Sequence, residues 1–320
     1  MRGRFGFFFA ICLALAADSA GAQQYPAKPV TIVVPFAAGS GTDLITRLLG
    51  QQLAVALNQS VVVENKPGAS GVIAATYVAR AAPDGYTLLM ATNSTHSANP
   101  SLFKSLPYDP VKDFAPVARA GSYVFMLVIN PELPARTLPE LVAYAKANPG
   151  KLTYASGNTT GIVAGETLKS KAGIDVLHVP YKSTPPALND VLGGRVSMMF
   201  IDLAPGLEHV RAGTLRALAV TTKERSALLP DLPSLHEAGI PGYDVTSWAG
   251  LFAPAGTPNE IVARLNEEMR KIISNPDVRA KIAVTGFDAF TGPPETLAAF
   301  VQSELTNWAK LIKDAGIEPQ

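Results

Sequence analysis

Cysteine is nearly absent from this chain of 320 residues. The only one, Cys12, lies in an apolar run, residues 5–17, that follows two arginines and precedes the small-residue pattern Ala20-Gly21-Ala22. This arrangement is typical of a secretory signal peptide, which we predict to span residues 1–22. Cleavage removes the cysteine, so we expect the exported protein to have neither a disulfide bond nor a thiol nucleophile.

An excess of charge is missing as well. Without residues 1–22 the chain carries 25 basic and 25 acidic side chains, because Arg2, Arg4 and Asp18 leave with the signal peptide. This balance gives no sign of a nucleic-acid partner or of an anionic membrane surface. No later apolar run is long enough to cross a bilayer, so after cleavage we expect no membrane insertion and predict a soluble monomer in the periplasm.

Metal and cofactor motifs are also lacking. The four histidines are isolated, without a paired spacing: His96, His178, His209 and His236. We therefore predict no metal site. The turn Gly39-Ser40-Gly41 is followed by Leu44 where a dinucleotide fingerprint has glycine, and no P-loop lysine follows, so no cofactor is expected.

What the chain does contain is a strong α/β pattern. Residues 30–43 predict a buried strand, a glycine-rich turn and the start of a helix that ends near Leu57. Short strands and helices alternate after it, which indicates a mainly parallel sheet flanked by helices. Small residues at positions 37–41 let a ligand approach the backbone, and a helix N-terminus presents free N–H groups, so the turn is a candidate anion site. The alternative is an ordinary tight turn, with Asp43 only a first-turn acid.

Two crossings divide the chain. The β-rich run from Phe114 to Ile129 is too long for one compact strand, so we predict that it enters a second lobe near Gly121 and that the chain returns between Tyr243 and Phe252. The expected lobes are residues 23–121 with 243–320, and residues 122–242. A second glycine turn, residues 156–161, is expected to face the first across a cleft between hinged lobes. Two capping boxes, starting at Thr137 and Thr257, predict helix starts.

Catalytic residues do not assemble into a known apparatus, and we predict no enzyme. The segment Gly157-Asn158-Thr159-Thr160-Gly161 resembles a nucleophile elbow with threonine in place of serine. The elbow needs an acid and a histidine later in the chain, and His178 follows too soon. An exported hydrolase that uses this turn is one alternative. Asp43 and Asp202 could face each other as paired carboxylates, but each is also explained as a helix-start or strand-end residue.

Several blocks together resemble one family. They are Tyr25-Pro26, Pro35 to Asp43, Val63 to Ala69, Pro83 to Leu88, Val179 to Lys182, Leu192 to Gly194 and Gly250 to Pro258, and they cover nearly the whole mature chain. In this order they resemble the Bug receptors, the extracytoplasmic solute-binding proteins of tripartite tricarboxylate transporters. The resemblance implies a two-lobed Venus-flytrap fold, with two crossing strands as hinge, that closes on a small organic carboxylate held partly through ordered waters. One departure is Gly39-Ser40, where the family commonly has Gly-Gly.

The resemblance also implies the binding turns, residues 36–43 and 156–161, and an acidic position at Asp202. Polar loops at strand ends add further candidates. The predicted ligand-binding residues are Phe36, Ala38, Gly39, Ser40, Thr42, Asp43, Asn93, Ser94, Ser156, Asn158, Thr159, Thr160, Tyr181 and Asp202. Phe36, Tyr181 and Trp248 stand near strand ends, where core packing is the alternative. A carboxylate at Asp202 repels an anionic ligand unless it meets an amine, a hydroxyl or a protonated acid, so it is expected to select among ligands.

The predicted function is therefore a periplasmic receptor that presents a carboxylate to integral membrane transporter subunits. Besides the hydrolase, a ligand-binding sensor component that is not coupled to transport remains an alternative. The sequence does not name the ligand.

Overall fold

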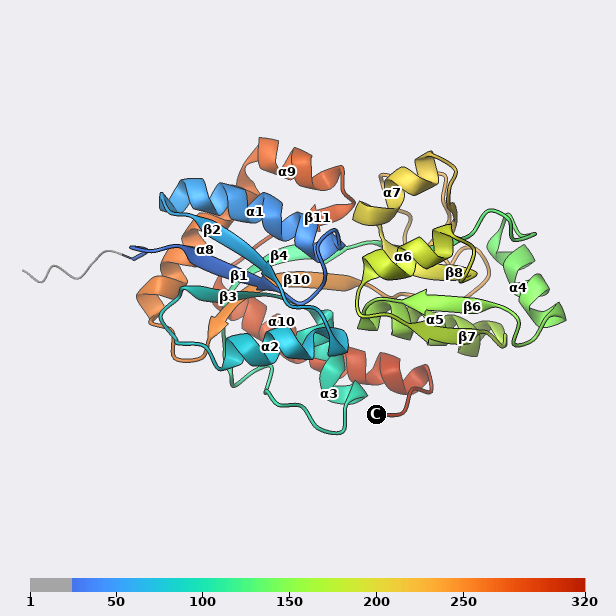
Figure 1. Cartoon of the computed structure of the whole chain (residues 1–320), viewed down its shortest axis with the longest axis horizontal. Helices are drawn as coiled ribbons and strands as arrows, with labels where there is room; N and C mark the ends of the chain where they lie inside the picture. The colour runs from blue at the N-terminus through green and yellow to red at the C-terminus, as the bar shows by residue number, and fades with distance from the viewer. Residues whose placement is uncertain (1–24, 320) are drawn as a thin grey trace, which may run out of the picture.

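The computed structural model describes residues 25–319 and shows two lobes, each built on its own β-sheet (Figure 1). The predicted signal peptide, residues 1–22, lies outside the described residues. None of the helices in the described part of the chain combines the length and the apolar character needed to cross a membrane.

The strands are β1 (Val30–Val34), β2 (Val61–Asn65), β3 (Thr87–Thr92), β4 (Phe114–Tyr123), β5 (Phe125–Ile129), β6 (Thr153–Ser156), β7 (Leu177–Pro180), β8 (Met198–Asp202), β9 (Arg216–Val220), β10 (Ser247–Pro254) and β11 (Phe287–Ala289). The α-helices are α1 (Gly41–Leu57), α2 (Val72–Ala79), α3 (Asn99–Leu102), α4 (Leu138–Ala147), α5 (Thr159–Ala172), α6 (Thr184–Leu192), α7 (Leu203–Arg211), α8 (Asn259–Ser274), α9 (Pro276–Ala283) and α10 (Pro294–Asp314). A short 3-10 helix, η1 (Ala69–Gly71), and a π-helical segment, η2 (Ser94–Ala98), complete the order.

The first lobe contains the six-stranded sheet, in the order β11-β4-β10-β3-β1-β2. Its strands have nearly continuous apolar sequences because both faces are covered. Alternate residues point to opposite faces: Ile32 and Leu88 join a core with α1 and α8, whereas Val33 and Leu89 join a core with α2 and α10. The loops after β1 and β3 lie at the junction with the second lobe, because their residues line one cleft together with residues of that lobe.

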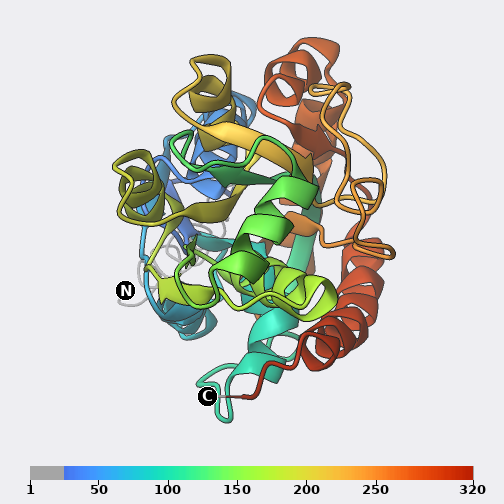
Figure 2. The same cartoon turned by 90° about the vertical axis from the view of Figure 1, so that its right-hand side faces the viewer.

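The second lobe contains the five-stranded sheet, in the order β7-β6-β8-β5-β9. Met126 and Met199 pack on α6 and α7, and the alternate residues Leu127 and Phe200 lie in the core with α4 and α5. In Figure 2 this lobe faces the viewer, and α10 runs along its edge. The helix packs on β4 of the first lobe and also touches α5 of the second.

Each sheet has the predicted parallel core, three adjacent strands in both lobes, to which antiparallel strands are added. β1, β2 and β3 are parallel, as are β6, β7 and β8, but β10 is antiparallel to β3 and β4, and β5 is antiparallel to β8 and β9. The physical reason is the crossing. β10 enters its sheet from the second lobe and β5 enters its sheet from the first, so each runs against its neighbours.

The chain changes sheets between Tyr123, the end of β4, and Phe125, the start of β5, slightly beyond the predicted crossing near Gly121. Ser247 pairs with Tyr123, so the two crossing strands lie side by side where the lobes meet. We keep residues 23–121 with 243–320, and residues 122–242, as proposed lobe limits.

Of the two predicted capping boxes, the structure contains the first and lacks the second. Thr137 caps α4 by accepting a hydrogen bond from the Glu140 N–H, as predicted. At α8 the cap is Pro258, because the Thr257 hydroxyl donates to the Pro254 carbonyl oxygen instead, at 2.7 Å. The second capping box was therefore a wrong prediction. The edge strand β11 and the π-helical segment η2 were not predicted.

Candidate ligand-binding cleft

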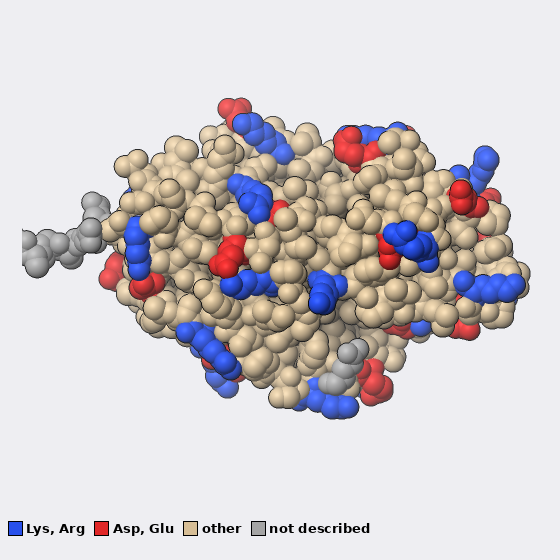
Figure 3. All heavy atoms as spheres, in the orientation of Figure 1, with Lys and Arg blue, Asp and Glu red and all other residues tan. Residues whose placement is uncertain are grey.

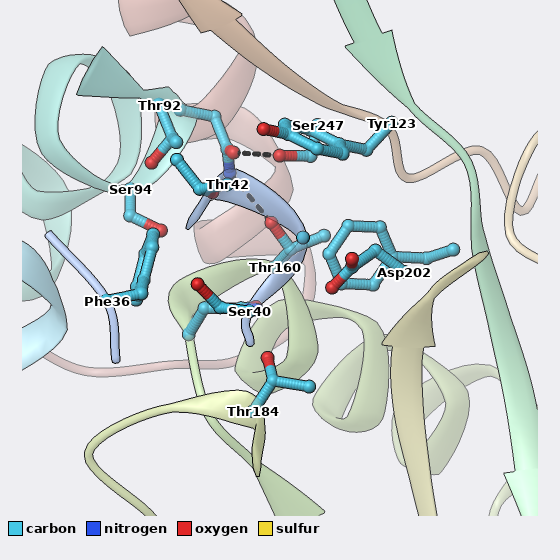
Figure 4. A pocket seen from close by; sticks show the side chains of 14 residues that line it. Phe36, Ser40, Thr42, Thr92, Ser94, Tyr123, Thr160, Thr184, Asp202 and Ser247 are labelled. Carbon is cyan, nitrogen blue, oxygen red and sulfur yellow. Dashed lines mark hydrogen bonds between the residues drawn. The ribbon is translucent and has the colours of Figure 1, made fainter. Parts of the chain in front are cut away.

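A narrow cleft lies where the two lobes meet, with a cavity volume of about 20 Å³ (Figure 4). The α1 turn and the end of β3 form its first-lobe wall, the crossing strands form its back, and α5, α6 and the end of β8 form its second-lobe wall. The lining residues are Phe36, Ser40, Gly41, Thr42, Thr92, Asn93, Ser94, Tyr123, Phe125, Asn158, Thr160, Thr184, Asp202 and Ser247.

The first-lobe wall is the N-terminal end of α1. Gly39 adopts φ +82°, a left-handed conformation that glycine accepts at little cost, and Ser40 caps the helix by accepting a hydrogen bond from the Asp43 N–H at 3.3 Å. The Ser40 carbonyl oxygen accepts from the Leu44 N–H. The N–H groups of Gly41 and Thr42 donate to no described residue, so they remain the free donors of this helix end.

Asp43 fixes the shape of this turn from outside the cleft. Its carboxylate accepts hydrogen bonds from the Gly39 N–H at 3.0 Å, from Arg47 Nε at 3.0 Å and from Asn65 Nδ2 at 2.8 Å. Asn65 also donates to the Phe36 carbonyl oxygen. Burial alone would raise the pKa of Asp43, but the hydrogen bonds from Arg47, Gly39 and Asn65 outweigh it and lower the pKa below its usual value. The side chain is thus an ionised brace for the turn.

The second-lobe wall is the N-terminal end of α5. Asn158 caps this helix by accepting a hydrogen bond from the Gly161 N–H at 2.9 Å. The first turn of α5 presents Thr160, whose hydroxyl accepts a hydrogen bond from Asn93 Nδ2 at 2.9 Å. Ser247, on the crossing strand β10, donates to Asn93 Oδ1, so one amide links the second lobe to the hinge (Figure 4).

The lobes are closed on each other around this cleft. Besides the bond between Asn93 and Thr160, the Ala37 N–H donates across the gap to Ser183 Oγ at 3.0 Å. The carboxyl group of Asp202 lies against the backbone of Gly41, so closely that a Cβ atom at position 41 would be 1.8 Å from Oδ1. Residues of both predicted turns line this cleft, and Gly41 is the residue that lets the acid of the second lobe approach.

Asp202 is the one acidic side chain of the lining, and it is 3% exposed. It stands at the end of β8 and at the cap position of α7, but its carboxylate caps no N–H there, and Oδ1 has no hydrogen-bond partner among the described residues. Burial raises its pKa to about 7. Thr92 Oγ1 and the Tyr123 hydroxyl are also buried without a hydrogen bond. Buried polar groups are rarely left unpaired, so these atoms mark places for ligand or water contacts.

Of the fourteen predicted site residues, eight line the cleft: Phe36, Ser40, Thr42, Asn93, Ser94, Asn158, Thr160 and Asp202. Six lie elsewhere. Ala38 and Gly39 are exposed, Asp43 braces the first-lobe turn, and Thr159 is buried at the start of α5. The Tyr181 hydroxyl donates to Asp190, on the outer side of α6. Ser156, the last of the six, forms a hydrogen bond with His178.

Six lining residues were not predicted: Gly41, Thr92, Tyr123, Phe125, Thr184 and Ser247. Tyr123, Phe125 and Ser247 belong to the crossing strands, whose apolar sequences give no sign of which residues border the cleft. Thr92 ends β3 directly before Asn93, and Gly41 lies inside the predicted turn. For these two, position at a strand end or a helix start was an available signal.

The contact between Ser156 and His178 is the arrangement closest to a nucleophile and base. Ser156 Oγ lies 2.6 Å from His178 Nε2, and the imidazole stacks on Tyr154. Neither side chain lines the cleft, so a substrate bound there would not meet the hydroxyl. Among residues 25–319 no three metal-ligating side chains gather into a group that could hold a metal ion.

Comparisons with known proteins agree with this geometry. Residues 45–317 match the family described as the tripartite tricarboxylate transporter family receptor, TctC. The protein BugT of Bordetella pertussis is 35% identical over 310 residues, which cover 96% of this chain and 95% of BugT.

Two solved structures share the fold along almost their whole length. Rpa4515 of R. palustris, in a structure with adipate, gives a TM-score of 0.90 at 36% identity and covers 92% of this chain and 100% of its own. MatC of Rhodopseudomonas palustris, with bound malate, gives 0.84 at 35% identity and covers 90% and 100%. Proteins of this family are periplasmic solute-binding receptors that work with membrane transporters, and they are not enzymes. The chain belongs to the TctC family of tripartite tricarboxylate transporter receptors, and its similarity to BugT and to the periplasmic binding protein BugD confirms the prediction of a Bug receptor.

Proposed function

We propose that this protein captures a small organic carboxylate in the cleft and presents it to the membrane subunits of a tripartite tricarboxylate-type transporter. The observation that carries the proposal is the helix end at Gly41 and Thr42, whose two free N–H groups belong to a cleft whose lining includes no lysine or arginine. A carboxylate accepts charge-assisted hydrogen bonds from such N–H groups and is favoured by the helix dipole, so it needs no basic partner.

Asp202 narrows the ligand class. Its unpaired Oδ1 repels a second carboxylate when ionised, but accepts a hydrogen bond from a ligand hydroxyl or from a protonated carboxyl group. When Asp202 is itself protonated, it donates to a ligand carboxylate. A dicarboxylic acid that shares one proton with Asp202, or a hydroxy acid, therefore fits best. The adipate and malate in the two related structures support this class.

Lobe closure completes the mechanism. Hydroxyl groups of Ser40, Thr160 and Thr184 come from both walls, so a ligand that contacts them all binds the closed form better than an open one. Such a ligand shifts the population toward closure, and ordered waters fill the remaining polar sites. A transporter that recognises the closed shape then accepts only the loaded receptor. We propose that this happens in the periplasm, with the receptor as a monomer after removal of residues 1–22.

The test is a thermal-shift screen of the mature protein, residues 23–320, against adipate, malate, citrate and benzoate, with adipamide as the uncharged match for adipate. A ligand at one hundred times its dissociation constant adds about 2.7 kcal/mol to the free energy of unfolding. We expect adipate or malate to stabilise the protein and adipamide to have no effect. Equal stabilisation by adipamide, or none by any acid in the screen, would overturn the proposal.

A further inference from the structure

The cleft does not supply the long-range attraction that an anionic ligand needs. Its lining includes no basic side chain, and the one acid present, Asp202, is repulsive in its ionised form. The N–H groups of Gly41 and Thr42 act only at short range, because the field of a helix end falls off within its first turn. Attraction over longer distances must come from charges outside the lining.

The basic side chains that border the first-lobe turn are paired with acids. Arg47 forms an ion pair with the buried Asp43 at 2.9 Å, and Lys66, which follows β2 beside the end of β1, forms one with Glu64 at 2.6 Å. Each pair is close to neutral at the distance from which a ligand approaches. They contribute little to steering.

Lys182 differs from both. Its side chain is exposed and makes no ion pair or hydrogen bond with any residue that the structure describes. The next residue, Ser183, accepts the hydrogen bond from the Ala37 N–H that joins the lobes, and the residue after it, Thr184, lines the cleft. Lys182 is therefore an uncompensated positive charge at the rim. In Figure 3, Lys and Arg side chains are spread over the face of the molecule that is in view.

We propose that Lys182 steers carboxylate ligands into the cleft and so sets the rate of capture without touching the bound ligand. The inference rests on the proposed carboxylate-binding function. A unit charge about 10 Å from a dianion changes the encounter rate by up to about fourfold in dilute buffer, and salt of about 0.5 M removes most of this effect. For a monoanion the expected factor is about twofold.

The experiment measures association and dissociation rates of adipate and malate by stopped flow, for the wild-type protein and for Lys182→Gln, Lys182→Glu and Lys182→Arg. The matched control is Lys146→Gln, which removes an exposed lysine in the last turn of α4, at the far end of the second lobe (Figure 1). In 10 mM salt we expect Lys182→Gln to slow association about fourfold, Lys182→Glu to slow it further, and Lys182→Arg and Lys146→Gln to leave it unchanged. At 0.5 M salt the four variants and the wild type should converge, with equal dissociation rates throughout.

Two results would overturn steering: association rates of Lys182→Gln that equal those of the wild type in dilute buffer, or a loss of affinity that persists at high salt and appears in the dissociation rate. The second would make Lys182 a ligand contact or a closure contact. Equilibrium titration of the wild type comes first, because it separates the carboxylate-binding function from steering by Lys182. If the wild type binds no carboxylate, the result counts against the proposed function. If the wild type binds and Lys182→Gln associates equally fast, the result counts against steering alone.

Discussion

The two glycine turns have the same local design but offer different chemistry to the cleft. In each, a strand leads through a short turn to a helix, and the cap side chain, Ser40 or Asn158, accepts a hydrogen bond from the N–H three residues later. The first turn presents bare backbone at Gly41 between the hydroxyls of Ser40 and Thr42, whereas the second presents the Thr160 hydroxyl without a glycine beside it in the lining. One wall is suited to binding a carboxylate through N–H groups, and the other is suited to adapting to the rest of the ligand.

The two turns also differ in how they are supported. The first is held by the ionised Asp43, which bonds Gly39, Arg47 and Asn65 within its own lobe. The second is held by the contact between Ser156 and His178 and by a close approach of the α6 turn to Gly157, where a Cβ would lie 2.3 Å from backbone atoms of Ser183 and Thr184. Gly157 thus permits packing within a lobe, while Gly41 permits packing between lobes.

The largest expected effects come from adding one methyl group at each glycine. Gly157→Ala should lower the free energy of unfolding by about 3 kcal/mol, because fixed backbone atoms cannot yield. Gly41→Ala should preserve folding, since alanine favours the helix, but weaken adipate or malate binding by about one hundredfold or more, because its Cβ collides with Asp202 only when the lobes are closed. Chemical denaturation and calorimetric titration measure the two effects.

Gly50→Ala is the matched control within α1. A Cβ there would be 3.4 Å from the nearest atom, in the Val61 side chain, and the contact stays inside the first lobe. This variant should bind as the wild type does. If Gly41→Ala also bound normally, Asp202 would have to move freely, and the distinction between the two glycines would fail.

The sequence predicted the turns themselves better than their side chains. Glycines, cap residues and apolar strands are local signals, so both turns, their helices and the position of Asp202 at the end of β8 agree with the structure. The direction of a side chain is not local. Asp43 and Tyr181 occupy positions typical of binding residues, yet Asp43 points to Arg47 and Tyr181 to Asp190, because these polar partners on the side away from the cleft satisfy them.

The crossing strands show the same limit at the level of the fold. Their apolar run was recognisable, but the pairing of β10 with β3 and β4 depends on the end from which the chain enters the sheet. Tyr123 and Ser247 border the cleft only because that pairing places them opposite each other. No periodicity in the sequence carries this information.

Replacing Asp202 or Asp43 by asparagine tests the comparison of the two walls through the pH dependence of stability. Burial raises the pKa of Asp202 to about 7, so the folded state loses stability as pH rises from about 4 to about 7, and Asp202→Asn should remove this loss. We expect the variant to be more stable than the wild type by about 2 kcal/mol at pH 8, with a much smaller difference at pH 5.

Asp43→Asn should behave in the opposite way. The pKa of Asp43 is lowered, so its contribution to stability is present above its unfolded value and is lost as pH falls through the folded one. The variant should therefore be less stable than the wild type at both pH 5 and pH 8. Thermal unfolding at pH 5 and pH 8 compares each variant with the wild type. If Asp202→Asn and Asp43→Asn changed the stability in the same direction at pH 8, the assigned roles, a neutral contact for Asp202 and a charged brace for Asp43, would be contradicted.

The smallest expected effect is on ligand affinity, and it tests whether N–H groups or hydroxyls of the first wall bind the ligand. Ser40→Gly keeps an acceptable cap, at a cost of a few tenths of a kcal/mol, and removes the hydroxyl from the cleft. If the Gly41 and Thr42 N–H groups carry the ligand carboxylate, affinity should change by about threefold or less. On the opposite wall Asn158→Ala should cost about 1 kcal/mol of stability, because alanine cannot accept the Gly161 N–H. Calorimetric titration decides the point: a tenfold loss of affinity in Ser40→Gly would mean that both walls bind through side-chain hydroxyls, and the difference between the turns would then lie in their support alone.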